Sequence, residues 1–181
     1  MARKLPPQHR ADVAGIYIPA NDTSIDKDRF YSELERMKAE GLDPEEHPIR
    51  RYYRGLTRFD LQAQDMLFGQ PVKAGDYFGP DAERWVLRRL SWDQWYEVTG
   101  LWKISDGTVD PASARQAQLR ACRYGIAGVE GTNLKLDGAQ AGSLTHGDMQ
   151  RIFDLDRGLP PILGDAIIAY SLPLSDQEKK A

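Results

Sequence analysis

Helix start signals constrain the fold of this chain more than any other feature of its sequence. The dipeptide DP at 110–111 is typical of an N-cap followed by a first helical residue. The stretch SWDQ at 91–94, and Thr145 with Asp148, have the spacing of capping boxes, in which two side chains satisfy backbone N–H groups reciprocally. Together with further prolines and apolar spacing, these signals predict helices that begin near residues 26, 80, 91, 110, 145 and 160.

Apolar side chains recur on one face of several of these segments. Between 26 and 40, Phe30, Leu34 and Met37 follow a helical period, and Gly41 is placed to end the helix. Pro80, with the apolar residues of RWVLRRL behind it, predicts a helix through Leu90. The fold class predicted is mainly α, with a single helical domain of about five helices.

The flanks of this helical domain have a different composition. Residues 1–25 hold three prolines around the run VAGIYIP and are expected to form an extended N-terminal arm or an edge strand. Residues 26–174 form the helical domain, in which 42–79 has no sustained period and TNLKLDG at 132–138 predicts a small β-hairpin. Residues 175–181 are almost wholly polar and are expected to form a solvated or partner-bound tail.

Composition narrows the class of protein. The chain has 181 residues, 41% of them hydrophobic, which is enough for one sizeable core. Its net charge of −3 gives no global footprint of a nucleic-acid binder, so nucleic acid is disfavoured as a partner. The apolar runs are too short to span a bilayer, and the only cysteine cannot form an internal disulfide. We therefore expect a soluble protein with no membrane partner.

Three glycines follow the predicted helix 110–124, in the stretch LRACRYGIAGVEG. Gly125, Gly128 and Gly131 come at the C-terminal end of a helix, where the helix dipole repels anions. A phosphate cradle would need them at a helix N-terminus. We interpret them as a structural bend that brings Ile126 and Val129 into the core.

Residues for metal, cofactor or acid–base chemistry are scattered. The three histidines, at 9, 47 and 146, include no pair at helical ligand spacing. Asp154 and Asp156 alternate as in calcium loops, but no distal glutamate follows them. Cys122 lies on an apolar helix face, where a thiol is usually inert. The sequence thus predicts no metal, no cofactor and no catalytic residues, although an enzyme using Asp60 or Asp154 stays an alternative.

The segment RRYYRGLTR offers the clearest candidate for partner binding. Arginine forks interleaved with tyrosines can grip a phosphate backbone, and the same residue types are enriched at protein interfaces. Because the whole chain is acidic, we favour a protein interface over nucleic acid and over a solvated loop without a partner. The candidate residues are Arg50, Arg51, Tyr52, Tyr53, Arg54 and Arg58.

Four tryptophans fall within a short distance of one another along the chain. Trp85 and Trp95 are expected in the core, and Trp92 and Trp102 are the candidate exposed anchors for a partner. The alternative is a single aromatic core made of all four.

The C-terminal third resembles a known class of protein. The segment ARQAQLRACRYGIAGVEG, a polar stretch with DG, and then LTHGDMQRIFDLDRGLPPILGDAIIAYSLPLSDQEKK resemble tail assembly chaperones and related tail-morphogenesis proteins of tailed bacteriophages. The match covers about residues 112–180. It implies a non-enzymatic protein that binds phage tail proteins such as the tape measure or tube subunits, with itself as a further partner in a homo-oligomer.

The resemblance also implies where the protein acts and which alternatives stand beside it. Its location would be the cytoplasm of the infected bacterial host, or the virion. One alternative is a structural virion protein of the minor tail or head–tail joining type. Another is a nucleic-acid-binding or host-inhibitory phage protein that uses the arginines and tyrosines of 50–58.

Overall fold

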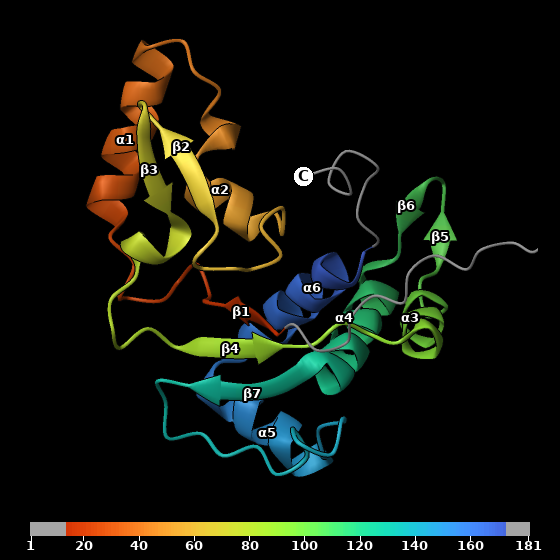
Figure 1. The fold of residues 1–181 in the computed structure, drawn as a ribbon. Helices are drawn as coiled ribbons and strands as arrows, with labels where there is room; N and C mark the ends of the chain where they lie inside the picture. Colours follow the sequence, from red (N-terminus) through yellow and green to blue (C-terminus); the bar gives the residue numbers. More distant parts are fainter. Residues whose placement is uncertain (1–13, 173–181) are drawn as a thin grey trace, which may run out of the picture.

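The computed structural model describes residues 14–172 and shows a mixed α/β fold, so the mainly α prediction is wrong (Figure 1). Three antiparallel sheets accompany six α-helices among these residues. The helices are α1 (Lys27–Ala39), α2 (Pro48–Tyr53), α3 (Trp92–Thr99), α4 (Pro111–Gly125), α5 (His146–Leu155) and α6 (Leu159–Ser171), with 3₁₀ turns η1 (Pro44–Glu46) and η2 (Ala74–Tyr77). The strands are β1 (Gly15–Tyr17), β2 (Gln64–Leu67), β3 (Gln70–Lys73), β4 (Arg84–Leu87), β5 (Ile104–Ser105), β6 (Thr108–Val109) and β7 (Ile126–Glu130).

A three-stranded sheet in the order β1-β4-β7 stands at the centre of the fold. Strand β4 replaces the helix expected between 80 and 90. Its side chains alternate between core and surface, and Trp85 and Leu87 are fully buried. Trp85 pairs with Tyr17 on β1 and with Val129 on β7. Partners distant in the sequence therefore decide the conformation of this segment.

Strand β1 lies at one edge of this sheet, as the edge-strand interpretation expected. Both backbone polar groups of Ile16 are bonded: the N–H donates to the Phe59 carbonyl at 3.0 Å, and the carbonyl accepts from the Tyr52 hydroxyl at 2.7 Å. The same hydroxyl accepts from the Ile18 N–H at 2.9 Å. This part of the expected N-terminal arm is thus built into the fold, and residues 1–13 lie outside the described part.

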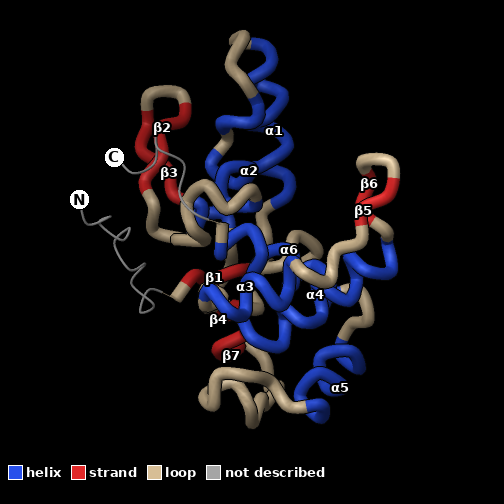
Figure 2. The backbone as a smooth tube through the Cα atoms, turned by 90° about the vertical axis from the view of Figure 1, so that its right-hand side faces the viewer, coloured by secondary structure: helices blue, strands red, loops and turns tan. Residues whose placement is uncertain are grey.

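Two long helices cover one face of the sheet. In Figure 2, α4 and α6 run beside the strands β1, β4 and β7. Gly164 on α6 has no side chain, and an added Cβ would lie 2.2 Å from the Gln118 carbonyl oxygen on α4. The absence of a Cβ lets the two helix backbones approach closely, and fully buried Leu163 and Ile167 pack beside this contact.

The region from α1 to η2 forms a lobe at the upper left of Figure 1. Residues 42–79, for which the sequence predicted no regular structure, contain α2 and the hairpin β2–β3. Phe68 and Gly69 both have positive φ, as a tight two-residue hairpin turn requires. Buried residues of this lobe, among them Leu34 and Tyr77, join one apolar core with those under the sheet.

The small hairpin of the sequence analysis is misplaced. Residues 132–138 have no strand, and the short hairpin β5–β6 lies at 104–109 instead. Its turn is Asp106–Gly107, with both φ values positive. The long connection from β7 to α5 is held by side-chain hydrogen bonds rather than by strand pairing.

The helix starts predicted near 26, 91, 110, 145 and 160 are confirmed, whereas the one predicted at 80 is wrong. Ser91, Asp110 and Thr145 are the N-caps of α3, α4 and α5, and both capping boxes form. Asp26 caps α1, and Gly41 adopts the left-handed conformation after its end. Among residues 14–172, none of these helices is long and apolar enough to cross a membrane. The polar tail predicted at 175–181 lies outside the described residues.

Candidate functional site

The arginines and tyrosines of 50–58 fall on α2 and the turn after it, and their side chains diverge. Tyr52 is fully buried, and its hydroxyl bonds to the backbone on either side of Tyr17. Tyr53 is half-buried and packs edge-on against Tyr17, with ring centroids 6.0 Å apart. Tyr52 is therefore a core residue and offers no surface to a partner.

The arginines of this run are held by acids and carbonyls of the same chain. Glu45 on η1 pairs with Arg50 and, at 3.6 Å, with Arg54. Arg51 pairs with Glu46 at 2.8 Å and with Asp65 at 3.2 Å. Arg58 donates to the Leu172 carbonyl at 3.2 Å. These contacts neutralise much of the positive charge that a phosphate backbone would seek.

A groove between α1 and α2 brings part of this run together with residues that the sequence analysis did not connect to it. The groove has a volume of about 340 Å³, and Arg50, Tyr53 and Arg54 line one side of it. Phe30 and Tyr31 of α1 line the other side, and Tyr31 is 60% exposed. Lys27, Arg50 and Arg54 line this α1–α2 groove together with one carboxylate, Glu45, so its lining carries a net positive charge.

Behind the groove, a buried polar cluster joins α1 to α2. His47 is fully buried, and its Nε2 lies 3.1 Å from Glu33 Oε2, while its Nδ1 accepts from the Ile49 N–H at 3.2 Å. Tyr77 donates a short hydrogen bond to the same Glu33 oxygen. Burial lowers the pKa of His47 below its usual value. The acceptor role of Nδ1 requires a neutral ring, so His47 acts as a helix cap and not as a metal ligand.

The tryptophans divide between core and surface. Trp85 is fully buried, and Trp95 and Trp102 are half-buried against the core. Trp92 is 69% exposed and Tyr96, one helical turn later on α3, is 59% exposed. Their rings meet edge to face, with centroids 4.9 Å apart and planes at 89°. Trp92 thus has the exposure expected of an anchor, whereas Trp102 presents only part of its ring.

We refer to Trp92 and Tyr96 as the exposed aromatic pair. Helix α3, which carries this pair, is held in place at both of its ends. The Ser91–Gln94 capping box holds its start, and Glu97 binds Arg120 and the Tyr124 hydroxyl of α4. Tyr96 carries no sequence signal beyond its spacing from Trp92, and it was missed for that reason.

The three glycines of the predicted bend occupy three different positions in the fold. Gly125 is the last residue of α4, where an added Cβ would lie 2.3 Å from Ile167 Cγ2. Gly131 has φ +77° and ends β7, whereas Gly128 lies within β7 with its nearest neighbours at 4.0 Å. The chain passes from α4 into β7 at Ile126, which is fully buried. The segment predicted as a bend is therefore the junction between helix α4 and strand β7.

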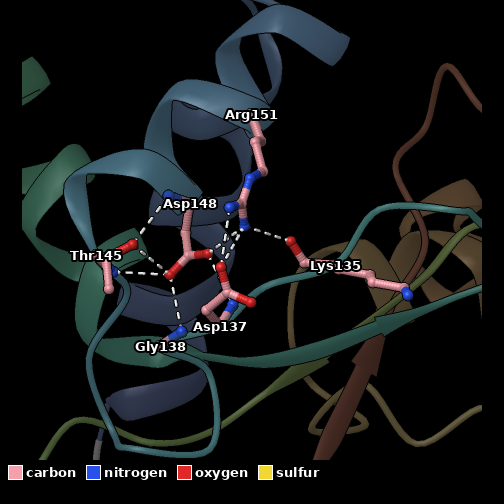
Figure 3. A network of polar contacts seen from close by, with 6 residues as sticks. All are labelled: Lys135, Asp137, Gly138, Thr145, Asp148 and Arg151. Atoms are coloured by element: carbon pink, nitrogen blue, oxygen red, sulfur yellow. Dashed lines mark hydrogen bonds and ion pairs between the residues drawn. The ribbon is translucent and has the colours of Figure 1, made fainter.

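Asp148 is a buried carboxylate. The sequence analysis predicted it only as the second member of a capping box with Thr145. It is fully buried and accepts hydrogen bonds from the Asp137, Gly138 and Thr145 backbone N–H groups at 2.8–2.9 Å (Figure 3). The Thr145 hydroxyl and Arg151 donate to it as well. Burial raises the pKa of this carboxyl, but the hydrogen bonds outweigh burial and lower it overall. Both oxygens are occupied, so this network fixes the β7–α5 loop.

The acids considered for catalysis are engaged locally. Asp60 accepts from the Gln62 N–H at 2.8 Å, and Asp154 accepts from the Gln150 amide at 2.9 Å. Cys122 is fully buried, and burial raises the pKa of its thiol to about 12.

Comparisons with protein-family models, with curated proteins and with solved structures find no match to the chain.

Proposed function

We propose that this protein is a non-enzymatic binding protein that holds tail components, such as tape measure or tube subunits, during assembly of a bacteriophage tail. The exposed aromatic pair is the observation that carries the binding role. The resemblance of residues 112–180 to tail assembly chaperones supplies the class of partner. The protein would act in the cytoplasm of the infected bacterial host.

The exposed aromatic pair has the properties of an interface anchor. Tryptophan and tyrosine dominate the residues that contribute most to protein–protein affinity. Edge-to-face packing and the fixed ends of α3 hold both rings in one arrangement before binding. A preorganised surface loses less conformational entropy on association. Exposed Ile104 and Val109 on the β5–β6 hairpin, which follows α3 along the chain, extend the apolar character of this part of the molecule.

A structural virion protein is the nearest alternative, and it would use the same pair. Its presence in purified particles at a fixed copy number would favour it over a chaperone that departs after assembly. A homo-oligomer would also bury the pair, and sedimentation of the purified chain tests for it. The nucleic-acid alternative has less support, because the arginines of 50–58 are bonded within the chain.

Affinity capture of the tagged full-length chain from phage-infected cells tests the proposal. We expect tail tube or tape measure protein in the captured fraction, and recovery at least ~10-fold lower for the double variant Trp92→Ala/Tyr96→Ala. Tyr31→Ala is the matched control, since Tyr31 is a similarly exposed aromatic residue on another helix. Equal recovery by the pair variant and the control, or capture of no tail protein, would refute the proposal.

A further inference from the structure

A second groove is lined by residues of α4 and α5. In Figure 2, α5 lies at the opposite end of the molecule from α1. Its volume is about 340 Å³. Leu119, Met149 and Phe153 give it apolar walls, and Arg120, Arg123 and His146 give it a basic rim. A further leucine and two glutamines complete the lining, so no carboxylate of residues 14–172 lines this α4–α5 groove.

The charge of the α4–α5 groove contrasts with that of the whole chain. The chain carries a net charge of −3, yet every ionisable group that lines this groove is basic. Arg120 is paired with Glu97 on α3, but neither Arg123 nor His146 has an ion-pair partner among residues 14–172. The α1–α2 groove differs, because Glu45 there binds two of the lining arginines. The rim of the α4–α5 groove thus carries positive charge that no carboxylate of its own lining balances among residues 14–172.

The side chains of this groove are held in place before any ligand binds. Arg123 Nε donates to the Leu144 carbonyl at 2.9 Å, which orients its guanidinium at the groove rim. Helices α4 and α5 both pack against α6, which keeps the groove walls at a fixed separation. Sites built on packed helices bind with less loss of conformational entropy.

We propose that the α4–α5 groove binds a segment of a partner protein in which apolar side chains such as leucine or phenylalanine are flanked by aspartate or glutamate. The apolar side chains would contact Leu119, Met149 and Phe153, and a carboxylate would pair with Arg123, because Arg120 is already paired with Glu97. A peptide is favoured over a nucleic acid, because the groove offers one aromatic ring and two arginines rather than a row of cations along a strand. The groove is separate from the exposed aromatic pair, and its binding does not depend on a role in tail assembly.

Fluorescence anisotropy with the full-length chain tests the proposal. The probe is a short fluorescein-labelled peptide of alternating Leu, Phe, Asp and Glu residues. Two control peptides carry Lys in place of the acids, or Ser in place of the apolar residues. We expect only the first peptide to bind, and its affinity to fall as salt is raised.

Matched variants locate the binding. We expect Arg123→Glu to weaken the peptide at least ~10-fold, whereas Arg115→Glu on the same helix, exposed and outside the groove, has little effect. Gln116 is exposed and its side chain makes no hydrogen bond within residues 14–172, so Gln116→Glu adds a carboxylate to the rim while the fold is kept. We expect this variant to weaken binding several-fold. The pair variant Trp92→Ala/Tyr96→Ala should bind the peptide as the wild type does, which separates this site from the proposed function.

Three outcomes would overturn the proposal. The first is equal affinity of the three peptides, or no binding of any of them. The second is equal weakening by Arg115→Glu and by the two groove variants. The third is binding of a fluorescein-labelled oligothymidylate as tightly as the acidic peptide, which would assign the groove to nucleic acid.

Discussion

Gly164 of α6 lies against the backbone of Gln118 of α4 so closely that a methyl group on Gly164 would meet the Gln118 carbonyl oxygen at 2.2 Å. The neighbouring atoms are backbone atoms, which cannot rotate away as a side chain can. The α4–α6 contact therefore requires glycine at position 164, because any other residue would place a Cβ atom against the Gln118 backbone.

We expect Gly164→Ala to lower the free energy of unfolding by about 3 kcal/mol, because α4 and α6 must move apart. Urea denaturation followed by circular dichroism measures the change. Gly128→Ala is the control, since the nearest atoms to its Cβ would lie at 4.0 Å in the middle of β7. A Gly164→Ala protein as stable as the Gly128→Ala protein would show that the helices pack differently.

Asp148 is the second position at which we expect a large effect. Asp148→Asn replaces one acceptor oxygen by an NH₂ group that faces backbone donors, and we expect a loss of about 3 kcal/mol in unfolding free energy. Asp154→Asn on the same helix is the control. Its carboxylate is exposed and accepts one side-chain hydrogen bond, so the expected change is below about 0.5 kcal/mol. Similar melting curves for both variants would contradict the buried network.

His47 should make stability depend on pH. Its pKa is lowered by burial from the usual 6.5, so the unfolded chain binds a proton there more readily than the folded chain. The stabilisation is therefore fully present above pH 6.5 and is lost as the pH falls below that value. Glu33, Tyr77, Arg29 and Arg50 are the charged or titratable groups around the ring.

Unfolding free energies measured across this range for wild type and for His47→Asn test the expectation. Asparagine can cap the Ile49 N–H without titrating, so the variant should show a flatter dependence on pH. His146→Asn removes an exposed histidine and should retain the wild-type dependence. Parallel curves for wild type and His47→Asn would mean that His47 is not held neutral.

Cys122 should be unreactive in the folded protein. Its side chain is fully buried and its thiol pKa is raised to about 12, so neither access nor thiolate favours modification. We expect Ellman's reagent at mildly alkaline pH to label it only as fast as the chain unfolds, and at once in urea. Equally rapid labelling with and without urea would place the thiol at the surface.

The helix starts could be predicted because their causes are local. Each cap at Ser91, Asp110 and Thr145 involves residues within three positions of one another, and the sequence displays them directly. Strand β4 could not be predicted in the same way. Its conformation comes from pairing with residues 15–17 and 126–130, and neither pairing leaves a signal in RWVL itself.

The candidate site was predictable only in part. Residue type and crowding predicted Trp92 as a candidate anchor, and the structure places it at the surface. The same reasoning failed for Tyr52, because the packing of its hydroxyl against β1 depends on a contact 36 residues away. The α4–α5 groove joins residues of two helices, and its one-sided charge becomes visible only when those helices are placed.

The contacts of Ile16 have a consequence for how copies of this protein can meet. The unpaired N–H and C=O groups of an exposed strand edge can pair with a strand of another molecule, which is a common route to aggregation. Here a tyrosine hydroxyl and a loop carbonyl occupy the outward N–H and C=O of β1, so they substitute for a fourth strand. This border of the sheet is closed to growth by strand addition, and the two contacts act independently, because Tyr52→Phe would free the Ile16 carbonyl but leave its N–H bonded to Phe59.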